Sequence, residues 1–236
     1  MPNVMRDAQM AWVAFAVAVL GIVASVMLLL MFATEVPYNG PYRYGAAYET
    51  LTAVANALTA ALVLYLSHLA GPSRGARVFA PVLAVLLVVG AGSAILLVTH
   101  VVGYAVSTAV TIAVLFLEGV WMIWLNRRMR LQNLFPASVS TIGWLIGVCL
   151  VIGLPLGVLG FMLPPLHIVQ LLVLGAGIFI AGAAWVIFAV WWVLVGVWLL
   201  RGRRPALGEV TPVTDGAADG APGATTRVKE RGRRKA

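Results

Sequence analysis

The sequence predicts an all-α fold, a bundle of six helices that cross a membrane, with the N- and C-termini both on the inner side. Of the 236 residues, 62% are hydrophobic and 10% are charged, whereas a soluble domain has about 25% charged residues. Six segments are apolar over the roughly 20 residues that a helix needs to cross the hydrocarbon. Basic residues are concentrated in alternate links between these segments, and this bias indicates which side faces inward.

The six expected helices make up a membrane domain of residues 1–200. They occupy residues 10–33, 46–69, 78–99, 104–126, 138–162 and 167–200. The first apolar run is much longer than the roughly 7–15 residues of a signal peptide, so we interpret it as a mature helix. Residues 35–45 and 71–75 carry the Pro, Gly and Asn residues of turns. The sixth segment is long for one crossing and is expected to tilt, or to bend at Gly175 or Gly177.

The orientation follows from the arginines. The outer links carry only Arg43, whereas the N-terminus, the other links and the C-terminal segment carry the rest. These inner residues are Arg6, Arg74, Arg77, Arg127, Arg128, Arg130 and the basic residues from Arg201 onward. Such a bias predicts that both termini are cytoplasmic. Tryptophans near the inner helix ends and tyrosines near the outer ends suit aromatic belts at the two interfaces. They are Trp12, Trp121, Trp124, Trp144 and Trp198, and Tyr38, Tyr42, Tyr44, Tyr48 and Tyr104.

Residues 201–236 have a different composition, rich in Gly, Ala, Pro, Thr and charge. Such a segment buries too little apolar surface to order itself, so we predict a disordered cytoplasmic tail. Its basic end, residues 227–235, marks the inner side and aids solubility, or else attracts anionic lipid headgroups.

The bulk composition also limits the partners. The formal charge of +8 fits the inner links and tail of a membrane protein, so we expect the lipid bilayer as partner and no nucleic acid. Arg outnumbers Lys 14 to 2, which we interpret as the coding bias of a bacterium and hence a bacterial cytoplasmic membrane. The single cysteine, Cys149, makes no internal disulfide. No phosphate-binding loop, metalloprotease motif or nucleophile elbow is present, so the sequence predicts no catalytic residue and no cofactor.

Glu118 is the most unusual residue for an apolar segment. It lies about eight residues from the basic cluster, roughly 12 Å deep at 1.5 Å per residue. An ionised side chain near the bilayer centre costs at least about 2.5–3.5 kcal/mol, so Glu118 is expected to be protonated, paired or in contact with water. Ser107 and Thr111 share its helix face. The alternatives are a hydrogen bond that joins two helices and a role in handling a proton or substrate.

A second polar stripe follows the helix expected at 46–69, at spacings of three, four and three residues. Its members are Glu49, Thr52, Asn56 and Thr59. Hydrogen bonds between helices are the ordinary role of such residues. In the alternative interpretation the two stripes face each other across a cavity, Asn56 binds a ligand at mid-depth, and Glu118 continues the path inward.

A weaker pattern concerns metal or haem. His100 and His167 are expected at the outer ends of two different helices, on the same side as Glu35 and Glu49. If they converge, imidazole and carboxylate groups can hold a divalent metal, and two histidines can ligate a haem.

The helix expected at 138–162 is rich in glycine and contains Pro155. Gly143 and Gly147 form a GxxxG step, as do Gly153 and Gly157, and such steps allow close helix packing. The alternative is a broken helix that exposes backbone groups at a binding site.

Three features resemble a family of small six-helix bacterial membrane proteins grouped as a domain of unknown function. They are Arg43-Tyr-Gly45 at the start of the second helix, the run from Trp124 to Arg130 followed by Phe135-Pro136, and the run from Trp185 to Trp192 before Arg201. The resemblance covers about residues 10–200 and implies no activity and no site residues.

Three functional classes remain open after the sequence has been considered. The leading hypothesis is a transporter-like membrane protein with an internal polar path that contains Glu118 and Asn56. The second is a non-catalytic subunit that binds a membrane-protein partner, or a second copy of itself, through its Gly-rich and Trp-rich faces. The third is a membrane protein that bears a metal or haem.

Overall fold

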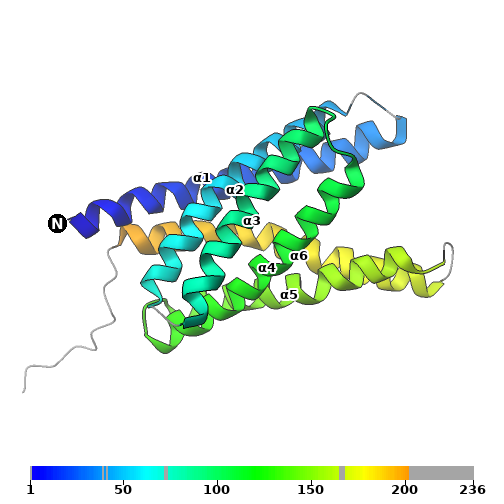
Figure 1. The fold of residues 1–236 in the computed structure, drawn as a ribbon. Helices are drawn as coiled ribbons and strands as arrows, with labels where there is room; N and C mark the ends of the chain where they lie inside the picture. The colour runs from blue at the N-terminus through cyan, green and yellow to red at the C-terminus, as the bar shows by residue number, and fades with distance from the viewer. Residues whose placement is uncertain (1, 39, 41, 72–73, 165–167, 202–236) are drawn as a thin grey trace, which may run out of the picture. The chain divides into compact units, whose positions relative to one another are not determined.

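The fold consists of six long α-helices. A computed structural model describes residues 2–38, 40, 42–71, 74–164 and 168–201, and this part of the chain contains no strand. The helices are α1 (Pro2–Leu30), α2 (Arg43–Leu69), α3 (Arg74–Val98), α4 (Tyr104–Leu131), α5 (Ala137–Met162) and α6 (Ile168–Leu200) (Figure 1). All of them belong to one compact unit, Met1–Pro205. The prediction of a disordered tail concerns residues that, after Arg201, lie outside the described part.

All six helices are long and apolar enough to cross a membrane, which confirms the predicted all-α class. α1 begins earlier than expected, at Pro2, and Pro is favoured in the first turn of a helix because it has no N–H to leave unpaired. α4 ends later than expected, at Leu131, and Arg128 and Arg130 in its last turn interact favourably with the helix dipole. α6 runs through Gly175 and Gly177 without interruption.

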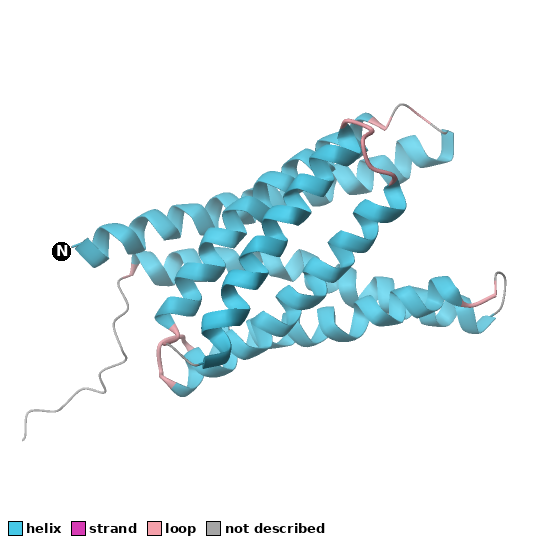
Figure 2. Cartoon of the chain, in the orientation of Figure 1, coloured by secondary structure: helices cyan, strands magenta, loops and turns pink. Residues whose placement is uncertain are grey.

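The helices pack in chain order. Each helix contacts the next one, and α6 returns to pack against α1, so the six form a closed ring of neighbours. Figure 2 shows the long helices and the loops between them. After α1 the chain continues through a π-helical turn (Met31–Glu35) and a 3-10 turn (Val36–Tyr38) before it reverses into α2. The links after α2, α3 and α4 are short, and short links make consecutive helices antiparallel neighbours. The basic ends of the helices therefore lie together at one end of the ring, which we call the basic end.

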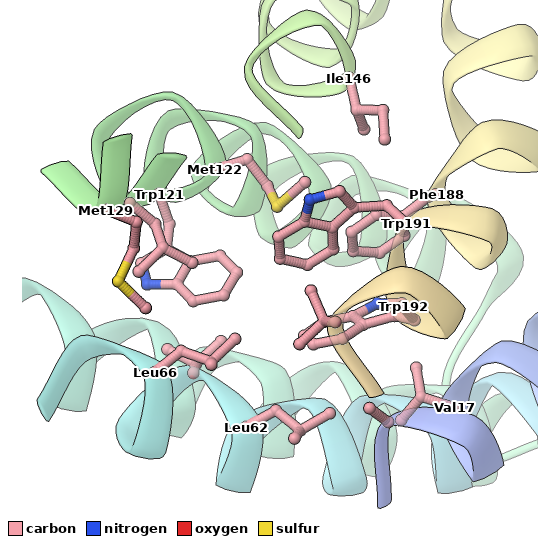
Figure 3. Packing of buried hydrophobic residues seen from close by; sticks show 14 of the residues in the cluster. Val17, Leu62, Leu66, Trp121, Met122, Met129, Ile146, Phe188, Trp191 and Trp192 are labelled. Carbon is pink, nitrogen blue, oxygen red and sulfur yellow. The ribbon is translucent and has the colours of Figure 1, made fainter. Parts of the chain in front are cut away.

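Side chains from the ring meet in an aromatic and aliphatic core. Trp121 of α4 lies over Leu66 of α2, and Trp191 lies beside Phe188, both on α6 (Figure 3). The Trp191 and Trp192 ring centroids are 4.7 Å apart with their planes at 65°, a favourable edge-to-face arrangement.

The interfacial role predicted for two tryptophans is wrong. Trp121 is completely buried, and its Nε1 donates a hydrogen bond of 2.9 Å to Ser67 Oγ on α2. Trp198 is also buried, with its ring 4.6 Å from that of Phe135. Indoles pack as well into a protein core as into an interface, so their place in the sequence did not distinguish the two. Trp12 and Trp144 remain exposed, as do Tyr38, Tyr42, Tyr44 and Tyr104 at the opposite helix ends.

The glycines of α5 allow close contact with two neighbouring helices. A Cβ built on Gly147 would lie 2.6 Å from the Gly119 carbonyl oxygen of α4, and one on Gly153 would lie 2.8 Å from the Ala181 nitrogen of α6. Further along, a Cβ on Gly160 would lie 2.6 Å from the Leu174 backbone. The helix continues through Pro155 as far as Met162. The glycines thus support close packing within the chain rather than a helix broken at a binding site.

Candidate functional site

A small cavity lies between the middles of α1, α2, α4 and α6. Its volume is about 30 Å³, and one water molecule needs roughly 10–15 Å³ by a comparable measure. Gly21, Ala24, Ala55 and Ala189 are among the lining residues, and their small side chains leave this space open. The polar lining residues are Thr52, Asn56, Thr59, Glu118, Trp185 and Trp192.

Glu118 is the one cavity-lining residue that α4 contributes, since the other lining residues come from α1, α2 and α6. Its side chain is 2% exposed, and its Oε1 has no hydrogen-bond partner among the described residues. No ion pair with Glu118 is formed within that part of the chain either. Its neighbours across the cavity are hydroxyl, amide and indole groups, so the carboxyl group lies in a polar but uncharged setting.

Two other buried polar atoms, from Thr52 and Trp192, lie on the cavity wall. Trp192 Nε1 has no hydrogen-bond partner in the described structure, and Thr52 Oγ1 has none of normal geometry, although it interacts with the Tyr48 hydroxyl one turn earlier on α2. Together with Glu118 Oε1 they supply a hydroxyl, an N–H donor and a carboxyl oxygen around one space. Buried polar groups are paired in the great majority of cases, because an unpaired one costs roughly 1–3 kcal/mol. The unpaired Glu118 Oε1 and Trp192 Nε1 on one cavity therefore indicate a site built for a small polar occupant.

A second indole on the cavity wall is paired. Trp185 Nε1 donates to Ser25 Oγ at 3.0 Å, and Ser25 Oγ donates to the Gly21 carbonyl at 2.8 Å. This short chain of hydrogen bonds joins α6 to α1 beside the cavity. The Trp185 indole thus links α6 to α1 at the cavity wall, whereas the Trp192 N–H group has no acceptor among the described residues.

The structure brings together only part of the polar path that the sequence predicts. Thr52, Asn56 and Thr59 of α2 meet Glu118 of α4 at the cavity. Glu49 is half-buried one turn nearer the start of α2 and does not line the cavity. Ser107 is buried and Thr111 half-buried, but neither lines it. Thr111 precedes Glu118 by seven residues, about 10 Å along the axis.

The weak metal hypothesis receives no support from the described residues, which contain no group of three His, Cys, Asp or Glu side chains able to hold a metal. His167 lies outside the described part, so that hypothesis stays a prediction. Glu35 has a different role, because its carboxylate accepts hydrogen bonds from the Tyr44 and Gly45 backbone N–H groups at the start of α2. His100 follows α3, which ends at Val98, and has a left-handed backbone, φ 61°; the N–H of Val101 donates back to the Leu96 carbonyl.

Sequence reasoning missed both tryptophans of the site. Trp185 and Trp192 are seven residues apart, a spacing that places them on one helix face. The spacing can be read from the sequence, but it does not distinguish Trp192 from its fully buried neighbour Trp191. Only the packing of α6 against α1 shows which indole reaches the cavity.

No protein-family model, curated protein or solved structure matches the chain. The resemblance to the six-helix family of unknown function therefore stays a prediction. The fold and the site together define a protein with six potential membrane-spanning helices and a carboxyl group buried at mid-helix.

Proposed function

We propose that the chain is an integral protein of a bacterial cytoplasmic membrane with both termini in the cytoplasm. Among the described residues, Arg6, Arg74, Arg77, Arg127, Arg128, Arg130 and Arg201 belong to the basic end, and Arg43 alone belongs to the opposite one. Because basic links stay on the cytoplasmic side, this asymmetry supports the orientation. The excess of Arg over Lys supports the bacterial source.

Within that membrane, we propose a transporter-like role in which Glu118 binds and releases a proton or a single small cation. The observation that carries the proposal is the Glu118 carboxyl group, buried without an ion pair and with Oε1 unpartnered among the described residues, on a cavity that it shares with Thr52 and the unpartnered Trp192 indole. Ionisable groups inside membranes are costly and mark ion or proton pathways. The mid-helix position also supports the proposal, because transporter sites lie near the bilayer midplane.

The size of the cavity limits what the site holds. Pockets for organic ligands have volumes of roughly 300–1,000 Å³, whereas this cavity measures about 30 Å³. It has room for one or two water molecules, or for a single small ion with oxygen ligands. The site therefore favours proton or ion handling over direct binding of an organic substrate.

Infrared difference spectroscopy of the full chain in lipid vesicles tests this proposal. We expect a carboxyl C=O band that changes as the pH is varied between about 5 and 9, and that disappears in Glu118→Gln. Glu49→Gln is the matched control, because Glu49 lies in a membrane helix but does not line the cavity. Thr52→Val should shift the band by removing a hydroxyl from the cavity wall, whereas Thr50→Val should not, because Thr50 is exposed and bonds to its own helix.

A different result would contradict the proton-handling role. If the Glu118 band is the same at every pH, and Glu118→Gln is as stable as the wild type, the carboxyl group is structural. The chain would then be better described as a non-catalytic membrane subunit. The faces that the sequence suggested for a partner are occupied, since the α5 glycines and Trp121, Trp191 and Trp192 pack inside the chain. A partner would have to bind elsewhere.

A further inference from the structure

A second and larger pocket lies at the basic end, between the last turns of α4 and the first turns of α5. Its volume is about 610 Å³, and its lining includes Asn126, Arg127, Arg130, Ser140 and Trp144. Arg127 and Arg130 are three residues apart and therefore neighbours on the α4 surface. Ser140 and Trp144 are four apart on α5 and face them. The pocket shares no lining residue with the Glu118 cavity.

The two arginines have no partner in the described part of the chain. No acidic residue lines the pocket, and no ion pair or hydrogen bond from either guanidinium is formed there. Their neighbour Arg128 differs, because its Nε donates to the Ala70 carbonyl at 2.8 Å and so joins α4 to the end of α2. Arg128 is thus used to hold the fold, whereas Arg127 and Arg130 are free to bind an anion.

Two buried polar atoms on the pocket wall also lack hydrogen-bond partners among the described residues. Asn126 is fully buried and Ser140 is 2% exposed, yet Asn126 Oδ1 and Ser140 Oγ have no hydrogen-bond partner among the described residues. The Asn126 amide is oriented, because its Nδ2 donates to the Met122 carbonyl at 2.9 Å. Its Oδ1 is therefore left as an acceptor, and Ser140 Oγ is able to donate. Neither atom has accessible surface, so the arginine pair is the part of the pocket that a bound group contacts.

The pocket lies where phospholipid headgroups meet the protein. Trp144 is 42% exposed, and amphipathic indoles favour the membrane interface. α5 begins at Ala137 with no side chain capping its first turn, so the positive end of its dipole adds to the arginine charges. Basic pockets between membrane helices on the cytoplasmic side suit anionic headgroups.

We propose that this pocket binds the phosphate group of an anionic phospholipid. Arg127 and Arg130 bind the phosphate with charge-assisted hydrogen bonds. The Asn126 amide and the Ser140 hydroxyl lie behind this pair without accessible surface, so they shape the wall rather than contact the headgroup. This inference rests on the membrane location proposed above but not on any role of Glu118.

Native mass spectrometry of the delipidated full chain in detergent measures the binding. Phosphatidylglycerol and phosphatidylcholine with the same acyl chains are titrated separately, and the anionic phosphatidylglycerol should bind more tightly. Arg127→Gln with Arg130→Gln should weaken phosphatidylglycerol binding on the order of tenfold. Arg77→Gln with Arg201→Gln is the matched control, because it removes the same charge from exposed positions at the same end. That control should retain most of the affinity.

A second variant and a competitor complete the test. Ser140→Ala should leave both phosphatidylglycerol binding and thermal stability unchanged, because the buried hydroxyl does not reach the headgroup and its removal leaves no partner behind. Inorganic phosphate should not displace the lipid. If it does, and its effect needs Arg127 and Arg130, the phosphate site stands but a soluble phosphate is its source. Equal weakening by the two arginine pairs, or equal affinity for both lipids, would overturn the proposal.

Discussion

At the scale of single residues, buried polar side chains in this protein fall into two groups. One group joins helices, as in the hydrogen bond from Trp121 Nε1 to Ser67 Oγ and in the contact between the Tyr65 hydroxyl of α2 and the Asp7 carboxylate of α1. The other group, with Glu118 and Trp192, faces a space without being paired. The first group accounts for stability, and the second is where we place binding.

The Trp121–Ser67 pair gives a prediction at this scale. Trp121→Phe removes the indole donor and leaves a buried hydroxyl, and part of the core volume is lost as well. We expect the free energy of unfolding to fall by about 1–3 kcal/mol, measured by denaturation in mixed detergent.

The control for this prediction is a double-mutant cycle with Ser67→Ala. If the hydrogen bond matters, the double variant should be less destabilised than the sum of the two single variants. Simple additivity would show that the Trp121 contribution is packing alone.

At the scale of helices, glycine determines how closely α5 and α6 approach. A Cβ on Gly177 of α6 would lie 2.3 Å from the Gly157 nitrogen of α5, a contact with backbone that no rotamer change relieves. Two residues earlier, a Cβ on Gly175 would meet no heavy atom within 4 Å. The same helix therefore carries a glycine that packing requires and one that it does not.

These two glycines form a matched pair of variants. Gly177→Ala should force α5 and α6 apart and destabilise the fold by about 1–3 kcal/mol. Gly175→Ala should change stability by less than about 0.5 kcal/mol, as exposed substitutions do. Heat-induced unfolding in detergent measures both variants. Equal effects would argue against the close approach of the two helices.

At the scale of the whole molecule, the basic end and the opposite end define a membrane topology that cysteine labelling can test. Val101, between α3 and α4, is 69% exposed at the end opposite the arginines, and Ser138 is exposed at the basic end. In a Cys149→Ala background, Val101→Cys should react with a membrane-impermeant maleimide added to intact cells. Ser138→Cys should react only after the cells are opened. The reverse pattern would contradict the proposed orientation.

The sequence by itself determined the class and the number of helices. Six apolar runs of membrane-spanning length lead to six helices because backbone groups in lipid have no water to bond to, and a helix satisfies them locally. Helix ends were also nearly predictable: Pro136 precedes α5, and Gly71 follows α2 with a left-handed backbone, φ 83°. Glu118 and the stripe from Thr52 to Thr59 were recognisable because polar residues are rare in such segments.

Only the tertiary structure decided which of these residues meet. Apolar side chains are almost as well solvated by lipid as by a protein interior, so hydropathy does not separate the lipid-facing side of a helix from the buried side. This is why Trp121 was misplaced at the interface, and why Ser107 and Thr111 were assigned to a path whose cavity they do not line. The convergence of Glu118, Thr52 and Trp192 depends on the closure of α6 onto α1, a contact between the two ends of the membrane domain. No local pattern encodes that contact.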